Sequence, residues 1–139
     1  MPRTRLETRA RARVLQALYA WDLRAGQPLN RVAEQIWDDL AVPPDERRFA
    51  GPLVRTLDAE ARDIDRDLAA VTTNWRLERL GAVERSVLRL AAAELRRGEA
   101  PSRVIIQEAV RLAERYGSAA SARFVNGVLD ALARKMGKL

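Results

Sequence analysis

The sequence predicts an all-α protein, and three observations support this fold class. Hydrophobic residues make up 47% and charged residues 32% of the 139-residue chain, proportions typical of a globular protein. Aromatic residues amount to only 5%, and Ala, Leu, Arg and Glu, all good helix formers, are abundant. Apolar residues recur with helical spacing, and no long stretch alternates as a strand would. We therefore expect about seven helices in two packed helical bundles, forming one domain over residues 1–139.

Glycine, proline and capping residues divide the chain into these helices. The first opens at Thr4 in a capping box and stops at a left-handed Gly26. Asn30 is expected to cap the second helix, and Pro52 to kink or restart the third. Cap candidates at Pro101-Ser102 and within Ser118–Ser121 precede the last two helices. Gly127 lies inside the last helix, where glycine costs about 1 kcal/mol relative to alanine. We expect another helix to pack closely on it. The expected helices span residues 4–25, 30–40, 44–71, about 75–80, 83–95, 102–116 and 121–136.

Composition excludes several kinds of functional site. The chain has no cysteine and no histidine, so a disulfide, a Cys/His zinc site and a Ser-His-Asp relay are all ruled out. No phosphate-binding loop or dinucleotide motif is present. The acids Glu84, Glu94 and Glu108, which lie within apolar helices, lack an accompanying nucleophile. Glu84 is expected to project outward, where it is available to a partner. We therefore expect no enzyme activity, no metal and no cofactor.

The net charge of +6 favours a polyanionic partner. The charge is uneven, because five of the first thirteen residues are arginine and only Glu7 among them is acidic. No apolar run approaches the roughly 18 residues that a membrane span needs, and no secretory signal core follows the basic start. The simplest compartment is the cytoplasm, without membrane association.

Helical spacing gathers part of this charge on one face of the first helix. A charged face is often merely solvated, but acids normally accompany the bases on such a face, and here Glu7 is the only carboxylate before Asp22. The mixture of cations, an amide and an aromatic ring suits RNA better than a membrane surface. The clustered residues are Arg5, Arg9, Gln16 and Tyr19, with Arg13 at the edge and Arg11 nearer the flank.

Four motifs carry a resemblance to a known family. They are Arg9-Ala-Arg11 with Leu15-Gln-Ala-Leu-Tyr-Ala-Trp21, Val83-Glu-Arg-Ser-Val-Leu-Arg-Leu-Ala91, Val104-Ile-Ile-Gln-Glu-Ala-Val110, and Arg123-Phe-Val-Asn-Gly-Val-Leu-Asp130. In this order, and over nearly the whole chain, they resemble the NusB family of bacterial transcription antitermination factors.

The resemblance implies binding of the boxA element of nascent, single-stranded RNA together with the ribosomal protein NusE. Through that complex the protein would contact other Nus factors and RNA polymerase. The complex would help the polymerase to resist termination, notably on ribosomal RNA operons. A homodimer is also possible in this family. By matched position, Arg9, Arg11, Ser118, Arg123 and Phe124 would contact RNA, with Arg5, Arg13 and Gln16 added from the helix face. Tyr19 and Glu84 would contact NusE.

Two departures from the family pattern stand out. Gln107 replaces a usual asparagine, and residues 118–122 lack the acid that many members carry, so we expect less repulsion of RNA at that loop. Two other functions compete: a bundle that binds only proteins, and a detached RNA-binding domain of an RNA cytosine methyltransferase. A helix-turn-helix DNA binder fits less well, because the densest charge lies on the first helix.

Overall fold

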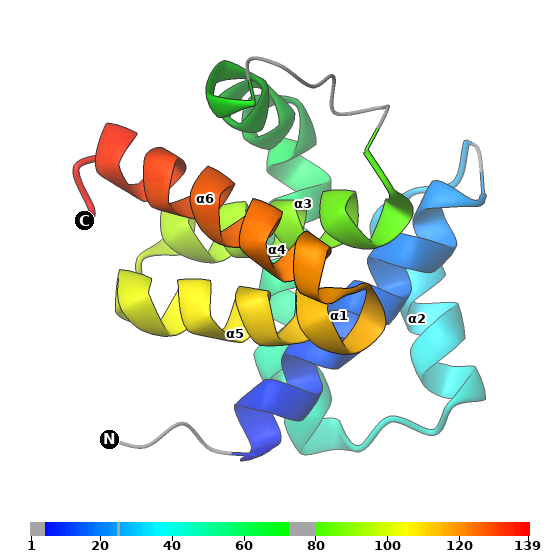
Figure 1. The fold of residues 1–139 in the computed structure, drawn as a ribbon. Helices are drawn as coiled ribbons and strands as arrows, with labels where there is room; N and C mark the ends of the chain where they lie inside the picture. The colour runs from blue at the N-terminus through cyan, green and yellow to red at the C-terminus, as the bar shows by residue number, and fades with distance from the viewer. Residues whose placement is uncertain (1–4, 25, 73–79) are drawn as a thin grey trace. The chain divides into compact units, whose positions relative to one another are not determined.

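The computed structural model describes residues 5–24, 26–72 and 80–139, and all regular structure in these ranges is helical (Figure 1). The predicted all-α fold is confirmed, with six described helices against about seven expected. The predicted Thr4 cap and nearly all of the short helix at 75–80 lie outside the described residues. The helices are α1 (Arg5–Asp22), α2 (Leu29–Asp39), α3 (Pro44–Val71), α4 (Ala82–Arg97), α5 (Ser102–Tyr116) and α6 (Ala119–Lys135).

The chain forms two compact units, residues 1–59 and 60–139, and α3 contributes to both. The break inside α3 lies at Glu60, whose φ of −117° and ψ of 21° are not helical. The expected kink at Pro52 is therefore wrong. Apolar residues that follow Pro52 on this helix, including Leu53 and Leu57, are buried, and this packing keeps the helix intact past the proline. Arg96 of α4 holds the break by an ion pair with Glu60, N to O 2.9 Å.

In the first unit, α1 packs against α2 (Figure 1). The Trp37 indole N–H donates to the Arg13 carbonyl oxygen at 3.1 Å, fixing α2 on α1. The predicted Asn30 cap is wrong, because α2 begins one residue earlier, after Pro28. The backbone N–H of Leu29 is instead satisfied by the Asp58 carboxylate of α3 at 3.2 Å, a distant acid that performs the capping role. Gly26 has the predicted left-handed conformation, with φ 83°, but it does not end the first helix as expected, because α1 already ends at Asp22.

In the second unit, α5 lies against both α4 and α6, and α4 also contacts α6. The unit's core is formed mainly by aliphatic side chains of these three helices. Gly98 ends α4 in the left-handed conformation, with φ 66°. Gly127 is exposed, and a Cβ built on it would meet no atom within 4 Å. The expectation that a helix packs closely on Gly127 is therefore wrong. Buried members of the core are Val87, Leu88, Leu90, Leu95, Ile105, Leu112, Val125, Leu129 and Leu132.

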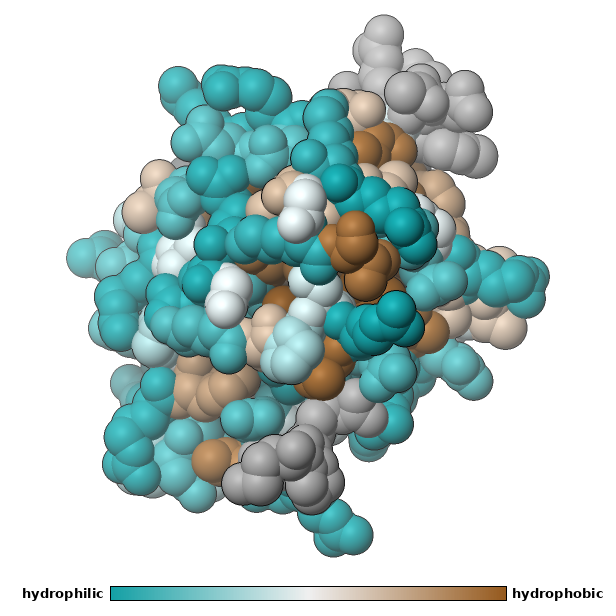
Figure 2. Space-filling model, turned by 90° about the vertical axis from the view of Figure 1, so that its left-hand side faces the viewer, coloured by the Kyte–Doolittle hydropathy of each residue, from teal (hydrophilic) through white to brown (hydrophobic). Residues whose placement is uncertain are grey.

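The surface is mostly hydrophilic in the view of Figure 2, where hydrophobic residues form small areas separated by polar ones. Among the described residues, the large apolar side chains left exposed include Tyr19, Leu23, Leu40 and Tyr116. None of the described helices combines the length and the hydropathy that crossing a membrane requires.

Candidate nucleic-acid interface

A single carboxylate of α3 binds two arginines of α1. Glu46 accepts from Arg9 Nε at 3.2 Å through one oxygen and from Arg13 Nε at 3.0 Å through the other. Only 3% of Glu46 is exposed, so its charge faces α1 rather than water. The sequence predicted a helix face without compensating acids. The structure supplies the acid from a residue 37 positions beyond Arg9 and 33 beyond Arg13.

The charge that remains accessible on α1 is concentrated at its start. Arg5 is exposed and has no partner among the described residues. The Arg9 side chain is still 53% exposed although it pairs with Glu46, whereas that of Arg13 is 26% exposed. Arginines with free donors of this kind can form bidentate hydrogen bonds with phosphate oxygens. Arg5 and Arg9 are therefore the cations of this face best placed to meet an external anion.

Gln16 and Tyr19 continue the same face toward the end of α1. The Gln16 side-chain oxygen accepts a hydrogen bond from Arg13 at 3.3 Å, which leaves its amide N–H₂ group to donate elsewhere. Tyr19 is 46% exposed. The predicted grouping of arginines, an amide and an aromatic ring on one face of α1 is thus present in the structure, with Glu46 added to it.

Arg11 lies in the interior rather than at the flank where the sequence placed it. It is 2% exposed, and its guanidinium lies 5.2 Å from the centre of the Phe49 ring of α3. Position 11 faces α3 because it falls near the apolar side of the helix, between Ala10 and Val14. Its visible role is to join α1 to α3 through a cation–π contact. An RNA contact by Arg11 stays a prediction, and it would require the side chain to leave Phe49.

The other predicted RNA-contacting residues lie at the start of α6, in the second unit. Ser118 caps this helix as predicted, because its hydroxyl accepts from the Ser121 N–H at 3.0 Å. Gly117 must be glycine, since a Cβ there would lie 2.7 Å from the Ala113 carbonyl oxygen. Arg123 is exposed and has no partner in the part of the chain that is described. Phe124 is half-buried.

Glu84, predicted to project outward toward a protein partner, is instead half-buried and bonded within its own unit. The Ser121 hydroxyl donates to the Glu84 carboxylate, and the Ser118 and Ser121 hydroxyl oxygens lie 3.1 Å apart. A Cβ on Gly81 would overlap the other Glu84 oxygen. The predicted partner contact Glu84 and the predicted RNA contact Ser118 are therefore joined through one intervening hydroxyl.

Sequence reasoning missed three residues that these geometries make important. In the sequence, Glu46 is simply an acid in the first turn of an expected helix. That pattern does not indicate that it pairs with arginines of another helix. Ser121 was noticed as a capping candidate but not as a donor to Glu84. Tyr116 is 43% exposed just before the α6 loop, and the Arg115 guanidinium lies 5.5 Å from its ring centre. Such a cation and ring pair suits base stacking.

Together, an all-helical fold, exposed arginines on α1 and at the start of α6, and the absence of cysteine and histidine define a class. This is a small helical protein whose two units each expose arginines of the kind that bind nucleic acid. The NusB family model matches residues 8–134, and the chain belongs to the NusB family. The resemblance noted in its motifs is confirmed.

Known relatives align with this chain over nearly its full length. The transcription antitermination protein NusB of Anaeromyxobacter dehalogenans is 44% identical over 133 residues, covering 94% of this chain and 92% of the relative. The NusB of Sorangium cellulosum is 42% identical over 130 residues, covering 93% and 92%. These relatives carry the name of a transcription antitermination protein, not of an enzyme.

Solved structures of NusB proteins also superpose on this chain over nearly its full length. T. maritima NusB has a TM-score of 0.86 at 33% identity, covering 96% of this chain and 93% of that one. A crystal structure of the antitermination factors NusB and NusE in complex with dsRNA has a TM-score of 0.84 at 30% identity, covering 96% and 99%.

Proposed function

We propose that this chain is a transcription antitermination factor that binds the boxA element of nascent RNA together with the ribosomal protein NusE. The complex then helps RNA polymerase, with other Nus factors, to resist termination, notably on ribosomal RNA operons. The observation that carries the proposal is the match, over 96% of this chain, to a NusB that was crystallised with NusE and RNA. Residues 1–139 would act as one RNA-binding domain in the cytoplasm, without catalysing a reaction.

The residues we assign to RNA follow from exposure and charge. Arg5 and Arg9 provide the accessible cations of α1, and Arg123 provides one beside the capped start of α6. Exposed arginine and helix N-terminal N–H groups both favour phosphate. Gln16, Ser118 and Phe124 would add polar and stacking contacts. Arg13 would contribute less because Glu46 and Gln16 already engage it.

The experiment is a binding titration of boxA RNA and a scrambled RNA of equal length, with and without NusE, at low and at high salt. Each phosphate contact to a single strand contributes about 0.7 to the salt slope. The double variant Arg5→Ala/Arg9→Ala should therefore weaken binding and lower the slope by about 1.4. The matched control is Arg24→Ala/Arg31→Ala, which removes a half-buried and an exposed arginine of the same unit, both outside the α1 face. Equal binding of boxA and scrambled RNA would contradict the proposal.

A pure protein-interaction bundle remains the second candidate, and one observation favours it. Glu46 neutralises part of the α1 charge, while Tyr19 is 46% exposed on the same helix. This alternative predicts tight NusE binding with no gain in RNA affinity. The same titration separates the two functions, and sedimentation of the free protein reports whether a homodimer covers the α1 face.

A further inference from the structure

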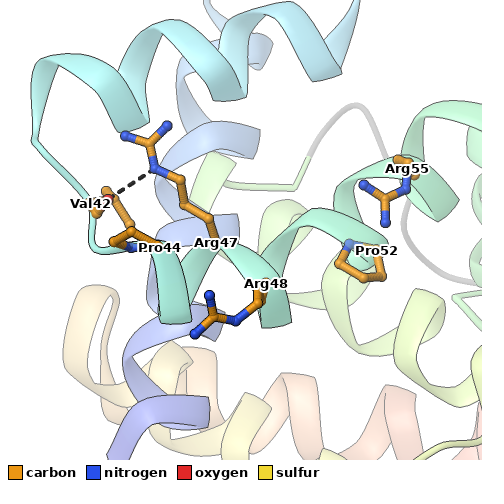
Figure 3. Close-up of a pocket in the computed structure, with 6 residues that line it drawn as sticks. All are labelled: Val42, Pro44, Arg47, Arg48, Pro52 and Arg55. Carbon is orange, nitrogen blue, oxygen red and sulfur yellow. Dashed lines mark hydrogen bonds between the residues drawn. The ribbon is translucent and has the colours of Figure 1, made fainter.

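We propose that a groove formed by the loop after α2 and the first half of α3 is a second phosphate-binding site, which holds the backbone of RNA extending beyond the boxA element. The groove has a volume of about 610 Å³. Its lining residues are Val42, Pro44, Arg47, Arg48, Pro52 and Arg55 (Figure 3). Three of the six are arginines and none is acidic, so the lining favours an anion.

The three arginines differ in their freedom to bind a ligand. Arg47 is engaged, since it donates to the Val42 carbonyl at 2.9 Å, to the Trp37 carbonyl at 2.8 Å and to Asp38 at 2.7 Å. Arg48 and Arg55 are exposed, and neither has a partner within the described ranges. Arg47 therefore has a structural role in the lining of the groove. Arg48 and Arg55 supply the guanidinium groups that can bind a ligand.

The spacing of Arg48 and Arg55 suits a chain of phosphates. They are seven residues apart on one helix, which corresponds to about 10 Å along its axis. In Figure 3 their guanidinium groups point to different places rather than converging on one point, and Pro52 lies on the helix between them. Successive phosphates of one strand can meet both groups. The pyrrolidine rings of Pro44 and Pro52 offer apolar contact to sugars between those phosphates.

The position of the groove in the same unit as the α1 face favours RNA as the occupant over an acidic peptide. Glu46, in the first turn of α3, binds Arg9 and Arg13. Arg48 follows it by two residues and so points to another side of the helix. The groove and the α1 face are thus two separate cationic sites of one unit, and a long RNA strand held at Arg5 and Arg9 has a second site to bind. This inference rests on the proposed function, because it assumes that α1 binds RNA.

The test uses the full chain and two RNAs, one limited to boxA and one with oligouridine flanks on both sides. Phosphate contacts do not read base sequence, so uniform flanks are adequate. The variant Arg48→Gln/Arg55→Gln should bind the short RNA as the parent protein does. It should bind the flanked RNA about tenfold more weakly at low salt, with a salt slope smaller by about 1.4.

The matched control is Arg24→Gln/Arg31→Gln, which removes the same charge from the half-buried Arg24 and the exposed Arg31, both outside the groove. The inference is overturned if this control weakens flanked RNA equally, or if Arg48→Gln/Arg55→Gln weakens both RNAs alike. It is also overturned if that variant reduces affinity for NusE alone and leaves both RNAs unaffected. If the parent protein does not bind the short RNA, the result contradicts the proposed function instead.

Discussion

The Ser121 hydroxyl donates a hydrogen bond to the carboxylate of Glu84. Ser121 lies in the first turn of α6 and Glu84 in the first turn of α4, so the bond ties together the starts of two helices. Ser118, whose hydroxyl oxygen lies 3.1 Å from that of Ser121, extends the chain of polar contacts into the loop that we assign to RNA. Glu84 is one of the two residues, with Tyr19, that we expect to contact NusE.

The first prediction concerns Ser121→Ala, which removes the donor to Glu84 while leaving the backbone N–H that Ser118 caps. A carboxylate without this bond has more rotamers to lose on binding, so affinity for NusE should fall about fivefold, the equivalent of one net hydrogen bond. RNA affinity without NusE should not change. Calorimetric titration with NusE measures the effect.

Ser118→Ala is the matched control, because it removes the helix cap and leaves the Ser121 donor in place. It should lower the free energy of unfolding by about 1 kcal/mol with little effect on NusE binding. NusE affinity unchanged by Ser121→Ala would show that the bond does not position Glu84.

The second prediction concerns Glu46→Gln. The amide keeps the size of the side chain but removes the charge that Arg9 and Arg13 share, so RNA affinity should rise and the salt slope should steepen by up to about 0.7. Loss of charged hydrogen bonds should lower the free energy of unfolding by about 1–2 kcal/mol. RNA titration and urea denaturation measure the two effects. Asp45→Asn removes a neighbouring exposed acid, and an equal gain in RNA affinity from it would refute a specific role for Glu46.

The third prediction concerns Gly127→Ala. Gly127 is exposed in the interior of α6, and its added Cβ would meet no atom within 4 Å. The substitution should therefore raise the free energy of unfolding by about 1 kcal/mol, the difference in helix propensity. Gly98→Ala is the contrasting variant and should destabilise, because Gly98 has a φ of 66°. Urea denaturation compares them, and a destabilised Gly127→Ala would disprove this interpretation.

The fourth prediction concerns Ala120→Asp, which restores an acid to the loop and first turn before Arg123. Ala120 is exposed near the N-terminus of α6, so the carboxylate should stabilise the helix by about 0.5 kcal/mol while repelling phosphate. RNA affinity should fall, whereas Ala120→Asn should leave it nearly unchanged. Filter binding measures this, and equal affinities of the two variants would argue against contact between RNA and this loop.

Much of the fold followed from local sequence signals. Helical spacing and Ser118 predicted helices and a helix start that the structure contains, because these depend on residues a few positions apart. Two of the failures involved distant residues. Asp58 replaced Asn30 as the cap of α2, and the break in α3 appeared at Glu60 instead of Pro52. A local pattern cannot reveal which remote side chain satisfies a helix end.

For the candidate interface too, some features follow from the sequence alone and others only from the tertiary structure. The sequence alone determined that arginines cluster on α1, that catalytic histidine and cysteine are absent, and that the motifs resemble NusB. Only the tertiary structure decided which of those arginines remain available. It buried Arg11 against Phe49, paired Arg9 and Arg13 with Glu46, and joined Glu84 to Ser121. Sequence spacing sets the face of a helix on which a charge lies, but packing sets whether that charge meets solvent or an opposite charge.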